Sequence, residues 1–256
     1  MTLPLSPLGR RYGYRPNPPD HRDYGLSRIE LVRTLPTAFS LKDSLGPVKD
    51  QGDEGSCTAH AGTENLEFLY RKYKHSEPIF SPAFLYYQER VIDGDPNYDG
   101  GSTGRSSCQA MHNYGVCLES QDPYVAGQYA IPPTAEQVQD ALQYKSGAYH
   151  FLTTVGDIKA CIASGYCVMV GFTVYQSFES IGSDGLMPTP DKNAEQVLGG
   201  HETLIYGYDD ATGLLSILNS WGPSWGDAGS FKMKYSDAAD SDIVMDLVIQ
   251  HLGLPW

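Results

Sequence analysis

The sequence predicts an α+β fold of two lobes with a cleft between them. In the first half, apolar residues recur at intervals of three and four, as they do on one face of a helix. After about residue 165, short apolar runs alternate with turn residues, as in antiparallel strands. Helices first and strands later favour α+β over alternating α/β. The 256 residues are enough for one domain or for two packed lobes.

Five helices are predicted, and the first begins at Cys57. Gly55 and Ser56 supply the turn and the N-terminal cap before it. Gly115 ends the third helix. The predicted helices cover residues 57–73, 81–91, 107–114, 135–144 and 155–163.

Four strands are predicted in the second half, at residues 166–174, 202–208, 214–219 and 229–234. Residues 209–213 contain two aspartates and a glycine, which indicates a hairpin turn between the middle two strands. We therefore expect one domain over residues 35–256, with a helical lobe at about 46–125 and a β-rich lobe at about 126–240.

The first 34 residues are predicted to form an extended N-terminal arm. Five prolines interrupt this segment, so it has room only for a short helix near residues 26–32. Residues 1–35 carry a net charge of +3, whereas the remainder carries −16. A basic arm is attracted to an acidic body and is expected to lie on it. The alternative is a solvated tail.

Composition excludes several classes of function. A net charge of −13 would repel a phosphate backbone, which argues against nucleic-acid binding. No apolar stretch approaches the roughly 18 to 20 residues of a membrane helix, and the first residues lack the apolar core of a secretory signal. We therefore expect no membrane partner. Location in the cytoplasm, or export without a standard signal peptide, both stay open.

Five cysteines are present, without a CxxC pair or a histidine cluster at zinc spacing. No metal site and no cofactor are predicted. An odd number leaves at least one thiol free, and we expect reduced, mostly buried thiols. Cys161 and Cys167 are the expected pair if a disulfide forms.

Cys57 is the candidate nucleophile. A thiol with an ordinary pKa of about 8.5 is mostly protonated at neutral pH, so it needs an environment that lowers its pKa. The first position of a helix provides the positive end of the helix dipole, and an imidazolium beside it would add to the effect. For an isolated cysteine at a helix start, a buried structural thiol is the more common role.

Three further residues complete a catalytic set with Cys57. His201 follows two glycines and begins an apolar run, so it is placed at a strand mouth where Gly200 leaves room for a substrate. Asn219 could orient the imidazole, and Trp221 could shield that hydrogen bond from water. Gly200 and Trp221 are also candidate substrate-binding residues. Gln51 could donate to an oxyanion together with the Cys57 N–H. Alone, a histidine at a strand end is more often structural than catalytic, an asparagine before a turn indicates only the turn, and Gln51 is similarly weak evidence.

Together these segments resemble the papain-like cysteine peptidases over about residues 35 to 234. The family carries Gln-Gly-x-x-Gly-Ser-Cys, a Gly-His or Asn-His pair, and Asn-Ser-Trp-Gly-x-x-Trp-Gly, which match Gln51, Cys57, His201 and Asn219. The resemblance implies a helical left lobe and an antiparallel β-rich right lobe. It also gives a glycine pair, at residues 100–101, the role of bonding the backbone of an extended peptide: Gly100 and Gly101 are thus candidate substrate-binding residues.

The chain departs from the family pattern at several positions. Glu54 and Tyr98 stand where many secreted relatives have paired cysteines, which supports reduced thiols. Residues 99–103 and 115–119 look most like bacterial members without those bridges. Thr58 replaces the usual tryptophan after the nucleophile, and Glu202 replaces a small residue after the base, where its carboxylate could perturb the imidazolium.

The sequence thus predicts a thiol peptidase that acts on peptide or protein substrates. The resemblance also allows residues 1–34 to be a propeptide that inhibits the enzyme from the cleft. The specificity pocket would be floored near the C-terminus, at Ile243 or Met245. Two alternatives stay open: a peptidase-like binding protein with an impaired site, and an acyl or amide transferase that uses the same thioester.

Overall fold

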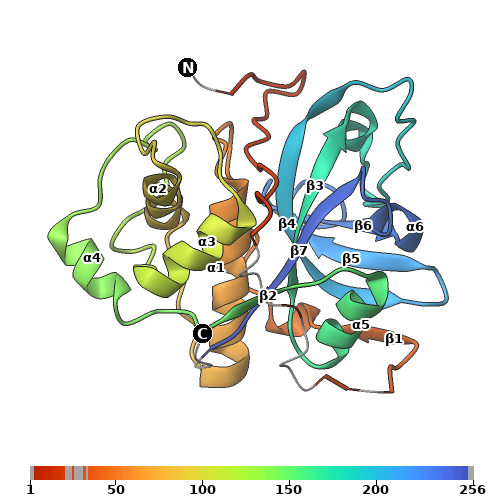
Figure 1. Ribbon diagram of the computed structural model, residues 1–256, viewed down its shortest axis with the longest axis horizontal. Helices are drawn as coiled ribbons and strands as arrows, with labels where there is room; N and C mark the ends of the chain where they lie inside the picture. Colours follow the sequence, from red (N-terminus) through yellow and green to blue (C-terminus); the bar gives the residue numbers. More distant parts are fainter. Residues whose placement is uncertain (1–2, 21–24, 26–30, 33, 253–256) are drawn as a thin grey trace.

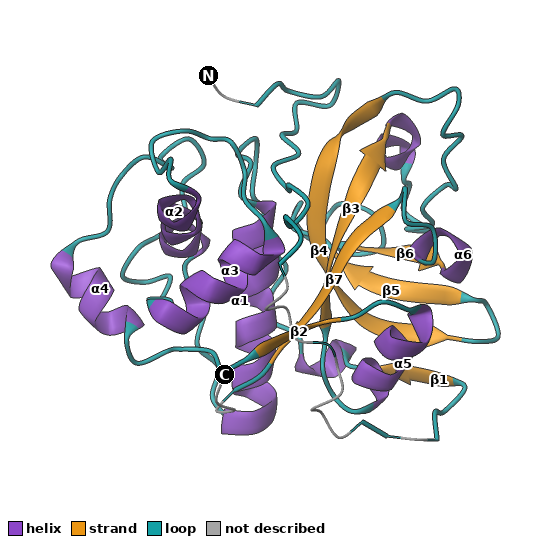
Figure 2. Cartoon of the chain, in the orientation of Figure 1, coloured by secondary structure: helices purple, strands orange, loops and turns teal. Residues whose placement is uncertain are grey.

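A computed structural model describes residues 3–20, 25, 31–32 and 34–252 of the chain. Helices α1 to α4 gather on one side and an antiparallel sheet of seven strands lies on the other (Figure 1). The predicted α+β fold with a helical and a β-rich lobe is confirmed (Figure 2). The helices and strands are, in chain order, β1 (Ala38–Ser40), α1 (Cys57–Leu69), α2 (Pro82–Asp93), α3 (Gly104–Asn113), α4 (Ala135–Ala141), β2 (Tyr149–Phe151), α5 (Val155–Ala163), β3 (Val168–Tyr175), β4 (Val197–Asp209), β5 (Leu214–Leu218), β6 (Ser230–Lys234), α6 (Tyr235–Ala238) and β7 (Val244–Gln250).

All five predicted helices and all four predicted strands are present. Helix α3 begins three residues earlier than expected because Thr103 caps it, with its hydroxyl accepting from the Ser106 N–H at 3.1 Å. The first helix changes to a π-helical turn at Tyr70–Lys74 before it ends at His75. The predicted hairpin joins β4 to β5.

The sheet has the strand order β2-β7-β3-β4-β5-β6, and β1 pairs with β4. Sequence reasoning missed β1, β2 and β7, although β7 lies inside the sheet between β2 and β3. Strand β7 also follows the expected end of the β-rich lobe at about residue 240. Helix α4 lies with the other helices in Figure 1, although the expected boundary at about residue 125 precedes it.

Each lobe has its own apolar core. Residues of β3, β4 and β5, such as Phe172 and Ile217, build the larger core. Residues of α1, α2 and α3, such as Leu66 and Phe84, build the smaller one. The lobes meet where α1 packs against β4. Because Cys57 begins α1 and His201 lies in β4, the contact between the lobes also positions the candidate site.

The N-terminal arm descends between the two lobes in Figure 1. It pairs with both lobes, through short bridges from Gly13 to Gly200 and from Tyr14 to Ser102. Most of the short helix expected near residues 26–32 lies outside the described residues. Within the described part of the chain, no helix has the length and apolar character needed to cross a bilayer.

Candidate active site

Cys57 is the first residue of α1 and is completely buried. Ser56 occupies the N-cap position, but the expectation that its side chain caps the helix is wrong. Its hydroxyl lies 2.7 Å from the Tyr124 hydroxyl and makes no capping bond. The N–H groups of the first turn are therefore not used by Ser56, and the positive end of the helix stays directed at the cysteine.

The Cys57 thiol is neutral in this arrangement. Burial raises its pKa to about 12, and the nearby Glu202 carboxyl adds to the rise. Backbone hydrogen bonds from Glu202 and Gly13 to the sulfur act in the opposite direction. The lowered pKa expected from the helix position is thus overridden, because desolvation disfavours the charged form.

His201 is held by Asn219. The imidazole Nε2 lies 2.8 Å from the Asn219 Oδ1, which also accepts from the Ser220 N–H at 2.9 Å. Since the amide oxygen can only accept, Nε2 carries the proton and Nδ1 is the basic nitrogen. Nδ1 is buried and has no hydrogen-bond partner among the described residues. Burial lowers the pKa of His201 to about 4, although the bond to Asn219 opposes this.

Trp221 covers the bond between His201 and Asn219. Its ring stacks on the imidazole with centroids 5.1 Å apart and an interplanar angle of 29°. Phe178 contacts both rings from another side. Because water is excluded, the hydrogen bond that fixes the imidazole is stronger than it would be in solvent. The Trp221 side chain also carries the Arg10 guanidinium over its face at 5.0 Å.

Gln51 is fixed by hydrogen bonds at both ends of its amide. Its Nε2 donates to the Glu54 carbonyl at 2.9 Å, and its Oε1 accepts from the Ser220 hydroxyl at 2.7 Å. Its backbone N–H donates to the Ser220 carbonyl at 2.9 Å. Ser220 therefore joins the loop before Cys57 to the loop after Asn219, and one N–H of the Gln51 amide stays available for a ligand.

The arm passes directly over this set of residues. The Gly13 backbone lowers the pKa of the Cys57 thiol, and the Gly13 carbonyl accepts from the Ser102 N–H at 2.9 Å. The Tyr14 N–H donates to the Gly200 carbonyl at 2.9 Å, next to His201. Gly13 and Tyr14 together thus bond the arm to the helical lobe, at Ser102, and to the strand that carries the histidine, at Gly200.

Glycine is required where the arm crosses the site. A Cβ on Gly13 would lie 1.9 Å from the Gly55 carbonyl oxygen, and a Cβ on Gly101 would lie 1.6 Å from the Gly13 oxygen. Gly101 also has a φ of +70°, which favours glycine. Gly100 instead packs against the Tyr98 ring, and the neighbouring Ser102 makes the backbone bonds to the arm. Ser102 was missed because only the glycines carried a motif signal.

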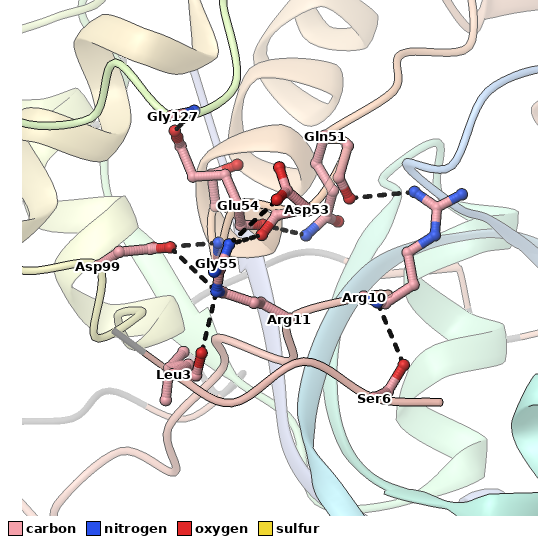
Figure 3. A network of polar contacts seen from close by, with 12 residues as sticks. Leu3, Ser6, Arg10, Arg11, Gln51, Asp53, Glu54, Gly55, Asp99 and Gly127 are labelled. Carbon is pink, nitrogen blue, oxygen red and sulfur yellow. Dashed lines mark hydrogen bonds and ion pairs between the residues drawn. The ribbon is translucent and has the colours of Figure 1, made fainter. Parts of the chain in front are cut away.

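Ion pairs hold the arm on the acidic body, as its charge predicts. The Arg10 guanidinium lies 3.3 Å from the Asp50 carboxylate, and Arg11 lies 3.4 Å from Asp53 and 3.8 Å from Asp99. Figure 3 shows that Asp99 faces both Arg11 and the Gly55 N–H, to which it bonds at 3.0 Å. The same carboxylate therefore ties the arm to the loop that precedes Cys57.

The departures from the family pattern have clear local partners. The Thr58 hydroxyl donates to the buried Glu89 carboxyl at 2.6 Å. Glu54 accepts from the Gly127 N–H at 2.8 Å, and burial raises its pKa to about 7. Glu202 lies on the face of β4 opposite to His201 and does not contribute to the shift of the His201 pKa, contrary to expectation.

The described residues contain neither a disulfide nor a group of side chains that could bind a metal. All five cysteines are free and buried, in agreement with the predicted reduced thiols. Across the described ranges, no group of three or more histidine, cysteine, aspartate or glutamate side chains is placed to hold a metal ion.

Comparison with known proteins identifies the family. Residues 35–251 match the model of the papain family of cysteine proteases. The chain belongs to the papain family of cysteine proteases. The matched residues begin directly after the arm, and the peptidase acts on peptide or protein substrates, as the family does.

A solved structure and two sequence relatives agree with this assignment. The peptidase is similar to the crystal structure of xylellain, a cysteine protease from Xylella fastidiosa, with 32% identity, a TM-score of 0.87, and coverage of 95% of this chain and 96% of that one. It is 30% identical to an uncharacterized peptidase C1-like protein of Acanthamoeba polyphaga mimivirus, over 99% of this chain and 91% of that protein. It is 28% identical to the oryzain gamma chain of Oryza sativa, over 82% of this chain but only 58% of that protein.

Proposed function

We propose that the chain is a cysteine endopeptidase in which Cys57 is the nucleophile and His201 is the base and then the acid. Asn219 orients the imidazole, and Gln51 donates to the oxyanion. The observation that carries this proposal is the 2.8 Å hydrogen bond between His201 and Asn219, which leaves Nδ1 basic and without a partner under Trp221. A buried polar atom without a partner is uncommon in a folded protein, so the free Nδ1 calls for an explanation, which a proton-transfer role supplies.

The proposed reaction proceeds through a thioester. The Cys57 thiol gives its proton to Nδ1 of His201, and the thiolate attacks the carbonyl carbon of the scissile bond. The oxyanion accepts hydrogen bonds from the Cys57 N–H and from the free N–H of the Gln51 amide. The C–N bond then breaks as Nδ1–H protonates the leaving amine. Water, deprotonated by His201, cleaves the thioester and restores the thiol.

We also propose that residues 1–34 act as an inhibitory propeptide of the domain at 35–256. The arm occupies the positions around Gly101 and Gly200 at which an extended substrate would pair. Gly13 of the arm lies next to the loop before Cys57, and its carbonyl accepts from the Ser102 N–H. No carbonyl of Gly13 is therefore presented to the nucleophile, which explains how the arm can fill the cleft without being cut there.

A bacterial origin stays a prediction.

The test compares labelling and hydrolysis. Intact mass and peptide mapping after reaction with a thiol-directed epoxide should show one label, on Cys57, that is lost in His201→Ala. An arm-displaced form should cleave an unfolded protein, and Cys57→Ala should abolish that cleavage. Cleavage that persists in Cys57→Ala would rule out the mechanism. The transferase alternative would be favoured by a different result: Cys57 reacts with the epoxide, but the unlabelled protein transfers the acyl group to an added amine and does not hydrolyse the peptide.

A further inference from the structure

Three residues form one row across the sheet beneath the arm. Glu202 of β4 and Asp246 of β7 both pair with Gly171 of β3, one from each side. Directly paired residues of antiparallel strands have their side chains on the same face. Because the middle residue is glycine, the row leaves a gap over β3 that is flanked by two carboxyl side chains.

The side chain of Tyr14 fills this gap. A Cβ on Gly171 would lie 2.1 Å from Cζ of the Tyr14 ring, so the ring rests directly on the glycine. The phenol donates a hydrogen bond to the Asp246 carboxylate, and only 3% of Tyr14 is exposed. The space over Gly171 is therefore a pocket between β4 and β7 that the Tyr14 side chain of the arm fills.

With the Tyr14 side chain in this space, the Glu202 carboxyl has no hydrogen-bond partner among the described residues. The residue is 1% exposed, and neither carboxyl oxygen has a hydrogen-bond partner among the described residues. The pKa of Glu202 is raised well above its usual value by burial first, and then by Glu89 and Asp246. Burial raises the pKa of Tyr14, and the charges of Asp246 and Glu202 add to the rise. A buried polar group without a partner calls for an explanation.

The charges around the pocket are otherwise acidic. Asp246 accepts from the Tyr14 hydroxyl and from the Asn17 N–H, both of which belong to the arm. Arg105 is the cation of α3 on this side, and its guanidinium bonds to the Pro18 carbonyl and lies over the Phe151 ring. Among the described residues, neither Glu202 nor Asp246 forms an ion pair with a cationic side chain. Asp246 therefore faces the space that Tyr14 fills, and the Glu202 carboxyl lies on the same side of the sheet, against Gly104 at the start of α3.

We propose that this pocket selects substrates with a lysine or arginine side chain, whose cationic group lies between Glu202 and Asp246. This specificity rests on the proposed peptidase function. A phenol satisfies Asp246 alone, whereas a cation satisfies both acids at a site where opposite charges interact strongly. The difference also suits an inhibitor: Tyr14 fills the pocket but leaves Glu202 unpaired, so a basic substrate can replace it.

The first test measures side-chain preference in hydrolysis. Peptides that differ at a single position, carrying lysine, norleucine or glutamate, are cleaved by the full chain and by its Gly13→Ala form. At one position, kcat/KM for lysine should exceed that for norleucine by at least about tenfold. Asp246→Asn should reduce this ratio, and the double variant Glu202→Gln/Asp246→Asn should bring it close to one. Cleavage without a lysine preference, or a preference that survives in the double variant, would overturn the inference and leave the peptidase function intact.

The second test does not depend on catalysis. Thermal unfolding is compared for full chains with Tyr14→Lys and Tyr14→Met, since the two new side chains have similar length and differ in charge. Tyr14→Lys should unfold at the higher temperature, and the order should reverse when Asp246→Asn is added. Equal unfolding temperatures would overturn the pocket assignment. If no peptide is cleaved by any form, the proposed peptidase function fails, and this measurement still decides whether the pocket binds a cation.

Discussion

Two consecutive residues of β4, His201 and Glu202, have opposite surroundings. His201 faces aromatic rings and is oriented by one strong hydrogen bond to Asn219. Glu202 faces the other lobe, next to Cys57 and the Tyr14 pocket, and its carboxyl has no partner among the described residues. Both side chains are buried, so burial alone does not explain the difference.

The two faces of β4 are therefore suited to different roles. On the His201 face, every neighbour restricts the ring to one orientation, which suits a proton-transfer group. On the Glu202 face, a glycine removes the side chain that would have filled the row, so the space must be occupied by another segment. The arm covers both faces: Tyr12 lies against His201, and Tyr14 enters the pocket beside Glu202.

The largest expected effect concerns the orientation of His201. In the Gly13→Ala background, Asn219→Ala should lower kcat/KM for peptide hydrolysis by about tenfold to a hundredfold, because a buried hydrogen bond to a charged ring contributes about 1.5–3 kcal/mol. Steady-state kinetics measures this loss. Asn219→Asp, which retains an acceptor, should recover part of the rate. An unchanged rate in Asn219→Ala would mean that packing alone orients the ring.

The second largest expected effect is that of displacing the arm from Cys57. Gly13→Ala places a Cβ 1.9 Å from the Gly55 oxygen, which the arm cannot accommodate over Cys57. We expect epoxide labelling of Cys57 and peptide hydrolysis to increase by about tenfold, equivalent to about 1.4 kcal/mol of lost arm binding. Gly25→Ala is the matched control, because nothing lies within 4 Å of a Cβ at that position. Equal rates for both variants would argue against inhibition by the arm.

Stability should depend on pH in opposite ways on the two faces. The pKa of His201 is lowered to about 4, so the unfolded chain binds more protons between pH 4 and 6.5, and stability rises with pH there. The pKa of Glu202 is raised well above its ordinary value of 4.5, so the folded chain binds more protons above that pH, and stability falls as pH rises. Denaturant unfolding of Glu202→Gln between pH 5 and 8 should show a smaller fall than the wild type, by at most about 1.4 kcal/mol per pH unit. Parallel curves would show that Glu202 is not buried as described.

The smallest expected effect is that of salt. The ion pairs of Arg10, Arg11 and Arg15 with the body are partly exposed, so each contributes about 0.2–1 kcal/mol and weakens with ionic strength. Raising the salt concentration from roughly 0.05 to 0.5 M should increase the labelling rate of Cys57 by about threefold. A chain with all three arginines replaced by glutamine should label faster at low salt and respond little to salt. A salt response that persists in that chain would place the effect elsewhere.

The sequence was informative where function depends on local signals. Cys57, His201, Asn219 and Gln51 lie in turns and element ends with distinctive neighbours, and the charge of the arm predicted its contact with the body. Helix and strand periodicity was sufficient for nine elements because each has its own apolar face. The position of the arm over Cys57 also follows the expected contact, although its bonding through Gly13 could not be foreseen.

The Tyr14 pocket could not be predicted in this way. Its walls come from the pairing of β3 with both β4 and β7, which is a long-range register that no local pattern specifies. Strand β7 was missed because Asp246 interrupts its apolar run, and that interruption is the residue that faces the pocket. Ile243 and Met245, the residues expected at the specificity pocket, lie three residues and one residue before Asp246. Likewise, the raised pKa of Cys57 depends on burial by a distant segment.

The most direct test of the account is the ultraviolet titration of the Cys57 thiolate, recorded as the difference between each protein and its Cys57→Ala counterpart. The full chain should show no thiolate absorbance near neutral pH, because the arm and the burial raise the pKa of Cys57 to about 12. The Gly13→Ala form should show the absorbance with an apparent pKa below about 8.5, and His201→Ala should remove that shift. A thiolate in the covered full chain at pH 7, or none in the released form, would contradict the claim that the arm covers a competent cysteine and histidine pair.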